Sequence, residues 1–105
     1  MSGDTTNELA RALELSRELL AAADRGDGRA VASLDAKRRE LLKSARSSTR
    51  VLDAAQTLLM QEVALLNDRS IGLLEHHRRI KQRQMEVAAA GRRAVHAYSN
   101  TRPLR

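Results

Sequence analysis

The sequence predicts an all-α protein, an antiparallel three-helix bundle with a long third helix extending beyond the first two. A column of apolar residues recurs at intervals of seven and predicts one helix over residues 51–99. That helix would be roughly 70 Å long at ~1.5 Å per residue, more than two shorter helices can cover. Short turns delimit two further amphipathic helices, over residues 6–25 and 28–46. The column comprises Leu52, Leu59, Leu66, Leu73, Ile80, Val87 and Ala94.

The first segment has an apolar face at helical spacing. Asp4 or Thr6 is suited to cap its N-terminus, and Glu8 lies in the first turn, where the helix dipole favours a negative charge. Gly26 suits the left-handed position that ends a helix. The predicted apolar face comprises Leu9, Leu13, Ser16, Leu20 and Ala23, widened by Leu15 and Leu19.

The second segment is predicted to begin after Asp27, which is suited to cap a helix. The short link makes the first two helices antiparallel neighbours. Arg38 interrupts the apolar stripe and has two interpretations. Its stem runs over apolar surface with the head group in water, or its guanidinium pairs with an acid on a neighbouring helix, such as Glu62. The stripe comprises Val31, Leu34, Leu41, Leu42 and Ala45.

The third helix is expected to follow a turn at Ser47-Ser48-Thr49, which can cap it. A second column, four residues beyond the first, is mostly polar, so the seam is expected to weaken beyond about Leu74. A partner, a second copy of the chain or solvent must cover the distal half. Residues 100–105 are predicted to be a disordered tail, and residues 1–105 one helical domain. The second column comprises Gln56, Val63, Ser70, His77, Gln84, Gly91 and Tyr98.

The charge of the chain is concentrated near its C-terminus. The 105 residues carry a net charge of +6. Residues 1–75 hold 11 Lys/Arg and 12 Asp/Glu, whereas residues 76–105 hold 8 Lys/Arg and only Glu86. A neutral body with a basic end permits contact with acidic protein surfaces, nucleic acid or membrane, although a solvated helix face has the same composition.

The sequence predicts neither an enzyme nor a cofactor or metal site. There is no cysteine, which excludes disulfides and fits a cytoplasmic protein. The adjacent His76 and His77 would point about 100° apart on a helix, too divergent to bind one metal ion. Neither a phosphate-binding loop nor a catalytic motif is present. Because residues 1–9 contain no apolar stretch, no signal peptide is expected, and no apolar run reaches the ~20 residues that span a bilayer.

Two features of the basic end suggest partners. The stretch from His76 to Arg83 is basic enough to contact phosphates, although helix-turn-helix spacing and stacking aromatics are missing. Tyr98 is the only aromatic residue, and it is either a core residue or a contact residue. The candidate partner-binding residues are Leu73, Leu74, Ile80, Val87, Ala94, Val95, Tyr98, Arg92 and Arg93.

Several elements, in order and at matching spacing from Leu13 to Arg102, resemble a known family, the FliT-type flagellar export chaperones. The first helix offers a Leu-rich face ending in Arg25-Gly26-Asp27, and the second offers Leu34, Arg38, Leu41 and Leu42 at matching spacing. The third offers Leu65-Leu66-Asn67-Asp68-Arg69, then Ile71, Leu73 and Leu74, and the end reads Gly91-Arg92-Arg93-Ala94 with Ala97-Tyr98. No one element is specific alone.

The resemblance implies a bacterial cytoplasmic chaperone that holds the flagellar filament-cap protein before type III export. It implies docking on the export ATPase and on the cytoplasmic domain of the export gate, and in some members binding of the flagellar master transcriptional regulator. Tyr98 matches the tyrosine presented to the gate. Two departures are noted: Gly28 stands where a Trp is common in the family, and the chain is expected to lack the further C-terminal helix of some members.

Two alternatives from other classes remain open. One is a basic helical protein associated with nucleic acid, whose affinity would fall steeply with salt. The other is a structural coiled-coil adaptor without a role in export, which only the identity of its partner would distinguish.

Overall fold

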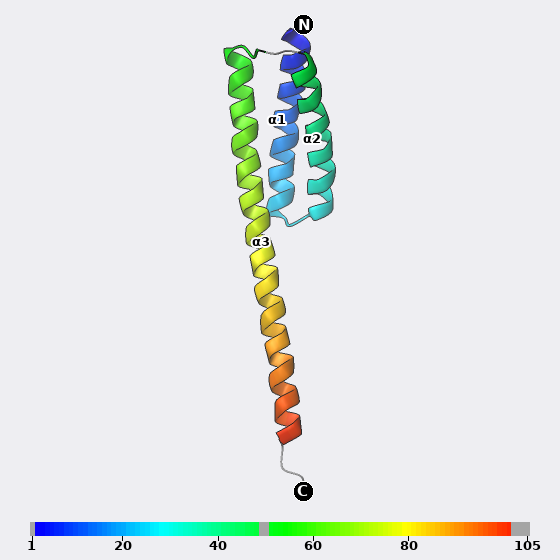
Figure 1. The fold of residues 1–105 in the computed structure, drawn as a ribbon, viewed down its shortest axis with the longest axis vertical. Helices are drawn as coiled ribbons and strands as arrows, with labels where there is room; N and C mark the ends of the chain where they lie inside the picture. The colour runs from blue at the N-terminus through cyan, green and yellow to red at the C-terminus, as the bar shows by residue number, and fades with distance from the viewer. Residues whose placement is uncertain (1, 49–50, 102–105) are drawn as a thin grey trace. The chain divides into compact units, whose positions relative to one another are not determined.

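The computed structural model describes residues 2–48 and 51–101, and these residues form three α-helices without a strand. The helices are α1 (Ser2–Asp24), α2 (Gly28–Ser48) and α3 (Ala54–Thr101) (Figure 1). The prediction of an all-α protein is confirmed. The helix boundaries differ from the predicted ones by a few residues. Asn100 and Thr101 belong to α3, so the predicted tail is helical there, and residues 102–105 lie outside the described residues.

The chain divides into two compact units, residues 1–74 and residues 75–105. The first unit holds α1, α2 and the beginning of α3. The second holds the remainder of α3. The division follows from helix length, because α1 and α2 have 23 and 21 residues whereas α3 has 48.

The turn between α1 and α2 has the predicted chemistry. Gly26 has a φ of 70°, the left-handed conformation that glycine adopts readily. The Asp27 amide donates to the Ala22 carbonyl at 2.9 Å and the Gly26 amide to the Ala23 carbonyl at 3.0 Å, closing the end of α1. The Asp27 carboxylate then accepts a hydrogen bond from the Ala30 amide at 3.1 Å and caps α2.

The start of α3 depends on Asp53 rather than on the predicted serines. The Gln56 amide donates to the Asp53 carboxylate at 2.8 Å, and the Asp53 amide donates to the Gln56 side-chain oxygen at 3.0 Å. This reciprocal pair is a capping box, which delays the helix start to Ala54. Ser47 and Ser48 instead donate to backbone carbonyls within α2. Thr49 lies outside the described residues.

Helix α1 also begins earlier than predicted. The helix begins at Ser2, so Asp4 lies in its first turn and Thr6 lies inside it. The Thr6 hydroxyl accepts a hydrogen bond from the Gln56 side-chain amide at 3.1 Å. Because Gln56 both caps α3 and contacts α1, the two helix starts are held together.

Side chains from all three helices form the core of the first unit. The buried residues Ala12 and Leu13 of α1 meet Val63 of α3. The predicted apolar face of α1 is buried except for the half-buried Leu20, and the sequence analysis missed the buried Ala12 and Ala22. The half-buried residues that pack against this core are Leu41 and Leu42 of α2 and Leu59 and Leu66 of α3.

Within the first unit, the mostly polar column supplies the most deeply buried residues of α3. Gln56, Val63 and Ser70 are only 2%, 4% and 1% exposed, whereas the leucines Leu59 and Leu66 are half-buried. The rotation of α3 about its axis therefore places this column deeper in the core than the leucine column, whose Leu59 and Leu66 also pack against the core. Small or hydrogen-bonding side chains at these positions permit close approach.

Arg38 is buried, at 7% exposure, so the interpretation with its head group in water is wrong. Its guanidinium donates to the carboxylate of Asp35 at 2.5 Å and to the side-chain oxygen of Asn67 at 2.8 Å. The predicted pair with an acid on a neighbouring helix is also wrong, because the acid Asp35 belongs to α2 itself and the partner on α3 is the neutral amide of Asn67. Glu62 lies 3.7 Å from Arg17 instead. Arg38 thus links α2 to α3 through a buried polar contact.

We expect Arg38→Ala to lower the free energy of unfolding by about 2 kcal/mol, because it leaves Asn67 and Asp35 without their buried donor. Arg39→Ala is the matched control, since Arg39 contacts the same carboxylate but its side chain is 78% exposed. The control should change stability by less than about 0.5 kcal/mol. Urea titration followed by circular dichroism measures both, and equal effects would contradict the assignment.

We expect Gln56→Ala to lower the free energy of unfolding by about 1–2 kcal/mol, because it removes half of the capping box and the hydrogen bond to Thr6. Gln61→Ala, at an exposed position one to two turns further along α3, is the control and should be nearly neutral. Thermal unfolding of the two variants compares them. A neutral Gln56→Ala would show that neither bond contributes to stability.

Candidate partner-binding surfaces

The structure distributes the predicted partner-binding residues over both units. Leu73 and Leu74 belong to the first unit, where both are half-buried. The others belong to the second unit, and all of them are exposed. They are Ile80, Val87, Arg92, Arg93, Ala94, Val95 and Tyr98. The predicted set is therefore best treated as two surfaces, one in each unit.

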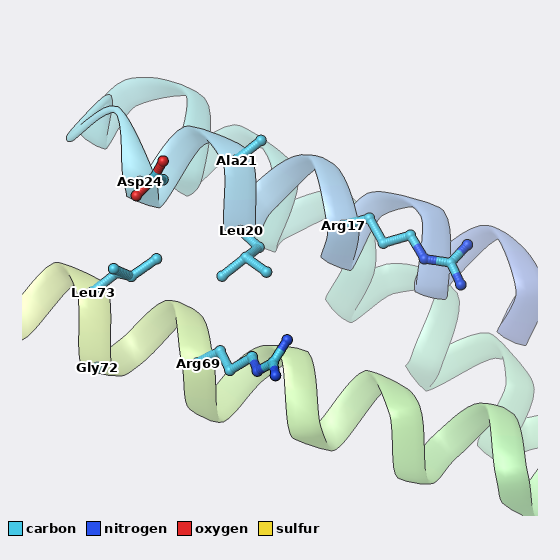
Figure 2. Close-up of a pocket in the computed structure, with 7 residues that line it drawn as sticks. All are labelled: Arg17, Leu20, Ala21, Asp24, Arg69, Gly72 and Leu73. Carbon is cyan, nitrogen blue, oxygen red and sulfur yellow. The ribbon is translucent and has the colours of Figure 1, made fainter.

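The surface in the first unit is a groove between α1 and α3 with a volume of about 630 Å³. Figure 2 shows the side chains of Leu20 and Leu73 directed toward each other from the two helices. Of the residues that line this groove, only Leu73 belongs to the predicted partner-binding set, and Leu20 belongs to the predicted apolar face of the first helix. That the two meet depends on how the helices pack. The lining residues are Arg17, Leu20, Ala21, Asp24, Arg69, Gly72 and Leu73.

The groove has an apolar floor and a rim of mixed charge. Arg69 extends from α3 toward α1, whereas Arg17 and Asp24 lie seven residues apart along α1 (Figure 2). Arg17 is 3.7 Å from Glu62, and both side chains are more than half exposed, so this ion pair contributes little. Such a groove suits an apolar side chain better than a phosphate group.

Gly72 lines the groove without a side chain of its own. A Cβ atom added at Gly72 would meet nothing within 4 Å, so no neighbour requires a glycine there. Glycine inside a helix costs about 1 kcal/mol relative to alanine. A Cβ atom added at Gly91, in the second unit, would also meet nothing within 4 Å.

The surface in the second unit is the remainder of α3. Residues 75–101 form a helix on which His77 and Ala89 are half-buried and the other residues with described side chains are exposed. Val87, Val95 and Tyr98 are 66%, 67% and 68% exposed. The interpretation of Tyr98 as a core residue is therefore wrong. The charged residues are mainly basic: Arg78, Arg79, Lys81, Arg83, Arg92 and Arg93 against Glu75 and Glu86.

Along this helix runs a stripe without charged residues, which we call the uncharged stripe. Its members are spaced alternately by three and four residues, so they share one face of the helix. Ile80, Val87 and Ala94 form one column, and the second column is more polar. The stripe comprises His77, Ile80, Gln84, Val87, Gly91, Ala94 and Tyr98.

No metal site or membrane span is found in residues 2–48 and 51–101. Their His, Asp and Glu side chains do not form a group of three that could hold a metal ion. The rings of His76 and His77 are 6.1 Å apart and tilted by 56°. None of the described helices is both long and apolar enough to cross a bilayer.

Comparison of the chain with protein-family models, with curated proteins and with solved structures found no match. The resemblance to FliT-type chaperones therefore stays a prediction from the residues that carry it.

We expect Gly91→Ala to stabilise the helix of the second unit by about 1 kcal/mol, because alanine loses less backbone entropy and has open space there. Amide hydrogen exchange around residue 91 should slow about fivefold. Gly28→Ala, at an equally open position in the first unit, is the control and should leave these amides unchanged. Unchanged exchange in Gly91→Ala would show that the glycine does not limit this helix.

Proposed function

We propose that this chain is a flagellar export chaperone of the FliT type. It holds the filament-cap protein in the bacterial cytoplasm before type III secretion. The observation that carries the proposal is the exposed helix of the second unit, where apolar side chains and the only aromatic residue, Tyr98, lie among arginines. Exposed apolar surface of this kind is typical of a protein-binding site.

The proposed scaffold is an antiparallel three-helix bundle formed by the first unit. It is supported by the short turn at Gly26, which suits antiparallel neighbours. It is also supported by the contact between Thr6 and Gln56, which joins the beginnings of α1 and α3. The proposed role of the bundle is to hold the start of α3 in a defined register.

The proposed client site lies on α3, around Leu73 and Leu74 in the first unit and Ile80, Val87 and Ala94 in the second. An amphipathic client segment that buries its apolar face there would be kept soluble without ATP. The groove beside Leu73 offers an apolar floor for such a segment. A second copy of the chain is the other occupant that this surface permits.

The proposed docking site on the export machinery comprises Tyr98, Val95, Arg92 and Arg93. A tyrosine offers a large contact area at a low cost in conformational entropy. Its partners in this proposal are the cytoplasmic domain of the export gate and the export ATPase. The flagellar master transcriptional regulator is a further proposed partner.

We expect Tyr98→Ala to weaken binding to the gate domain by tenfold or more while the helix content and client affinity stay unchanged. The side chain is 68% exposed, so its removal leaves no cavity. Tyr98→Phe keeps the ring and should retain most of the affinity. Calorimetry with the purified gate domain and circular dichroism measure these quantities. Loss of helicity in Tyr98→Ala would point to a structural role.

A pull-down of the C-terminal segment of the filament-cap protein, at low and high salt, tests the proposed function. Binding that persists at high salt would support burial of apolar surface on α3. Failure to bind would favour the structural adaptor. Binding of an oligonucleotide that falls steeply with salt would favour a nucleic-acid-associated protein.

A further inference from the structure

We propose that the helix of the second unit binds an acidic amphipathic helix along the uncharged stripe. This inference rests on the proposed function, because it takes the helix as a partner-binding surface, and it adds the chemistry of the partner. Three features of the helix carry it: the register of the stripe, the size of its side chains and the charges at its edges.

The uncharged stripe continues the register of the buried seam in the first unit. In that unit Gln56, Val63 and Ser70 are at most 4% exposed, because neighbouring helices cover them. The same column continues through His77, Gln84, Gly91 and Tyr98, and the leucine column continues through Ile80, Val87 and Ala94. In the second unit these positions are exposed, apart from the half-buried His77. Spacing of this kind is suited to receive another helix.

The side chains of the stripe are small toward its C-terminal half. Gly91 and Ala94 lie in its centre, and they are accompanied at the edges by Ala88, Ala90 and Ala97. Large side chains such as leucine from a partner helix would fill the space over these residues. A second copy of this chain in a parallel, in-register pair would place small residues opposite small residues and leave voids, so a partner with large side chains fits this half of the stripe better.

The edges of the stripe are basic in its N-terminal half. Lys81 and Arg83 occupy the positions that flank the stripe on its two sides. The acids Glu75 and Glu86 lie on the opposite face of the helix by their spacing. Charges at these flanking positions select the partner of a helix pair. They favour a partner with Glu or Asp at its edges and repel a second copy of this chain.

The test uses two synthetic four-heptad peptides, labelled with fluorescein, against the full chain. Both carry leucine at the core positions, and one has glutamate at the edges where the other has lysine. We expect fluorescence anisotropy to show binding of the acidic peptide about tenfold tighter than the basic one. Equal affinities for the two peptides would overturn the proposal.

Matched variants locate the site. The double variant Lys81→Glu/Arg83→Glu should reverse the preference, whereas Arg78→Glu/Arg79→Glu makes the same change in charge away from the stripe and should retain it. Val87→Glu should abolish binding, whereas Met85→Glu, at a position that is 64% exposed against 66% for Val87, should not. Circular dichroism confirms that the variants stay helical. If the two variants of either pair changed peptide binding equally, the assignment of the stripe as the binding site would be wrong.

Two further outcomes would overturn the inference. Sedimentation that shows a dimer dispersed by Val87→Glu would make a second copy the occupant. Tighter binding of an oligonucleotide than of the acidic peptide would make the basic residues a phosphate-binding surface. Failure of the filament-cap pull-down alone would reject the flagellar role and leave the peptide result standing, so the two proposals fail separately.

Discussion

The structure depends on the register of α3, whose side chains return to one face of the helix every three or four residues. In the first unit that face meets α1 and α2, and Val63 and Ser70 are almost fully buried there. In the second unit the same register presents Val87 and Tyr98 at the surface. One repeating pattern thus supplies a core in one unit and an exposed stripe in the other.

Polar contacts, rather than large apolar side chains, set how the helices of the first unit align. The chain has only one aromatic residue, and its core consists mainly of leucine, alanine and valine. Aliphatic side chains of similar shape permit several alignments of neighbouring helices. The bonds from Arg38 to Asn67 and from Gln56 to Thr6 each require particular residues to meet. Buried polar groups of this kind favour one alignment over the others because the alternatives leave them unpaired.

The separation of the two units also separates their chemistry. The first unit holds nearly all the acids and has balanced charge, whereas the helix of the second unit is basic. A basic helix with exposed apolar residues attracts acidic protein surfaces and resists pairing with copies of itself.

Local spacing determined much of the fold. Three helices, the turn at Gly26, the cap at Asp27 and most of the apolar face of α1 follow from neighbouring residues, because helix period and end chemistry are local properties. The capping box of Asp53 and Gln56 was equally readable and was missed. Only the tertiary structure determined the hydrogen-bond partners of Arg38 and the nearly complete burial of Gln56 and Ser70. It also determined that Leu20 and Leu73 line one groove. Each of these depends on how a helix is rotated and aligned against its neighbours, and residues distant in sequence determine that.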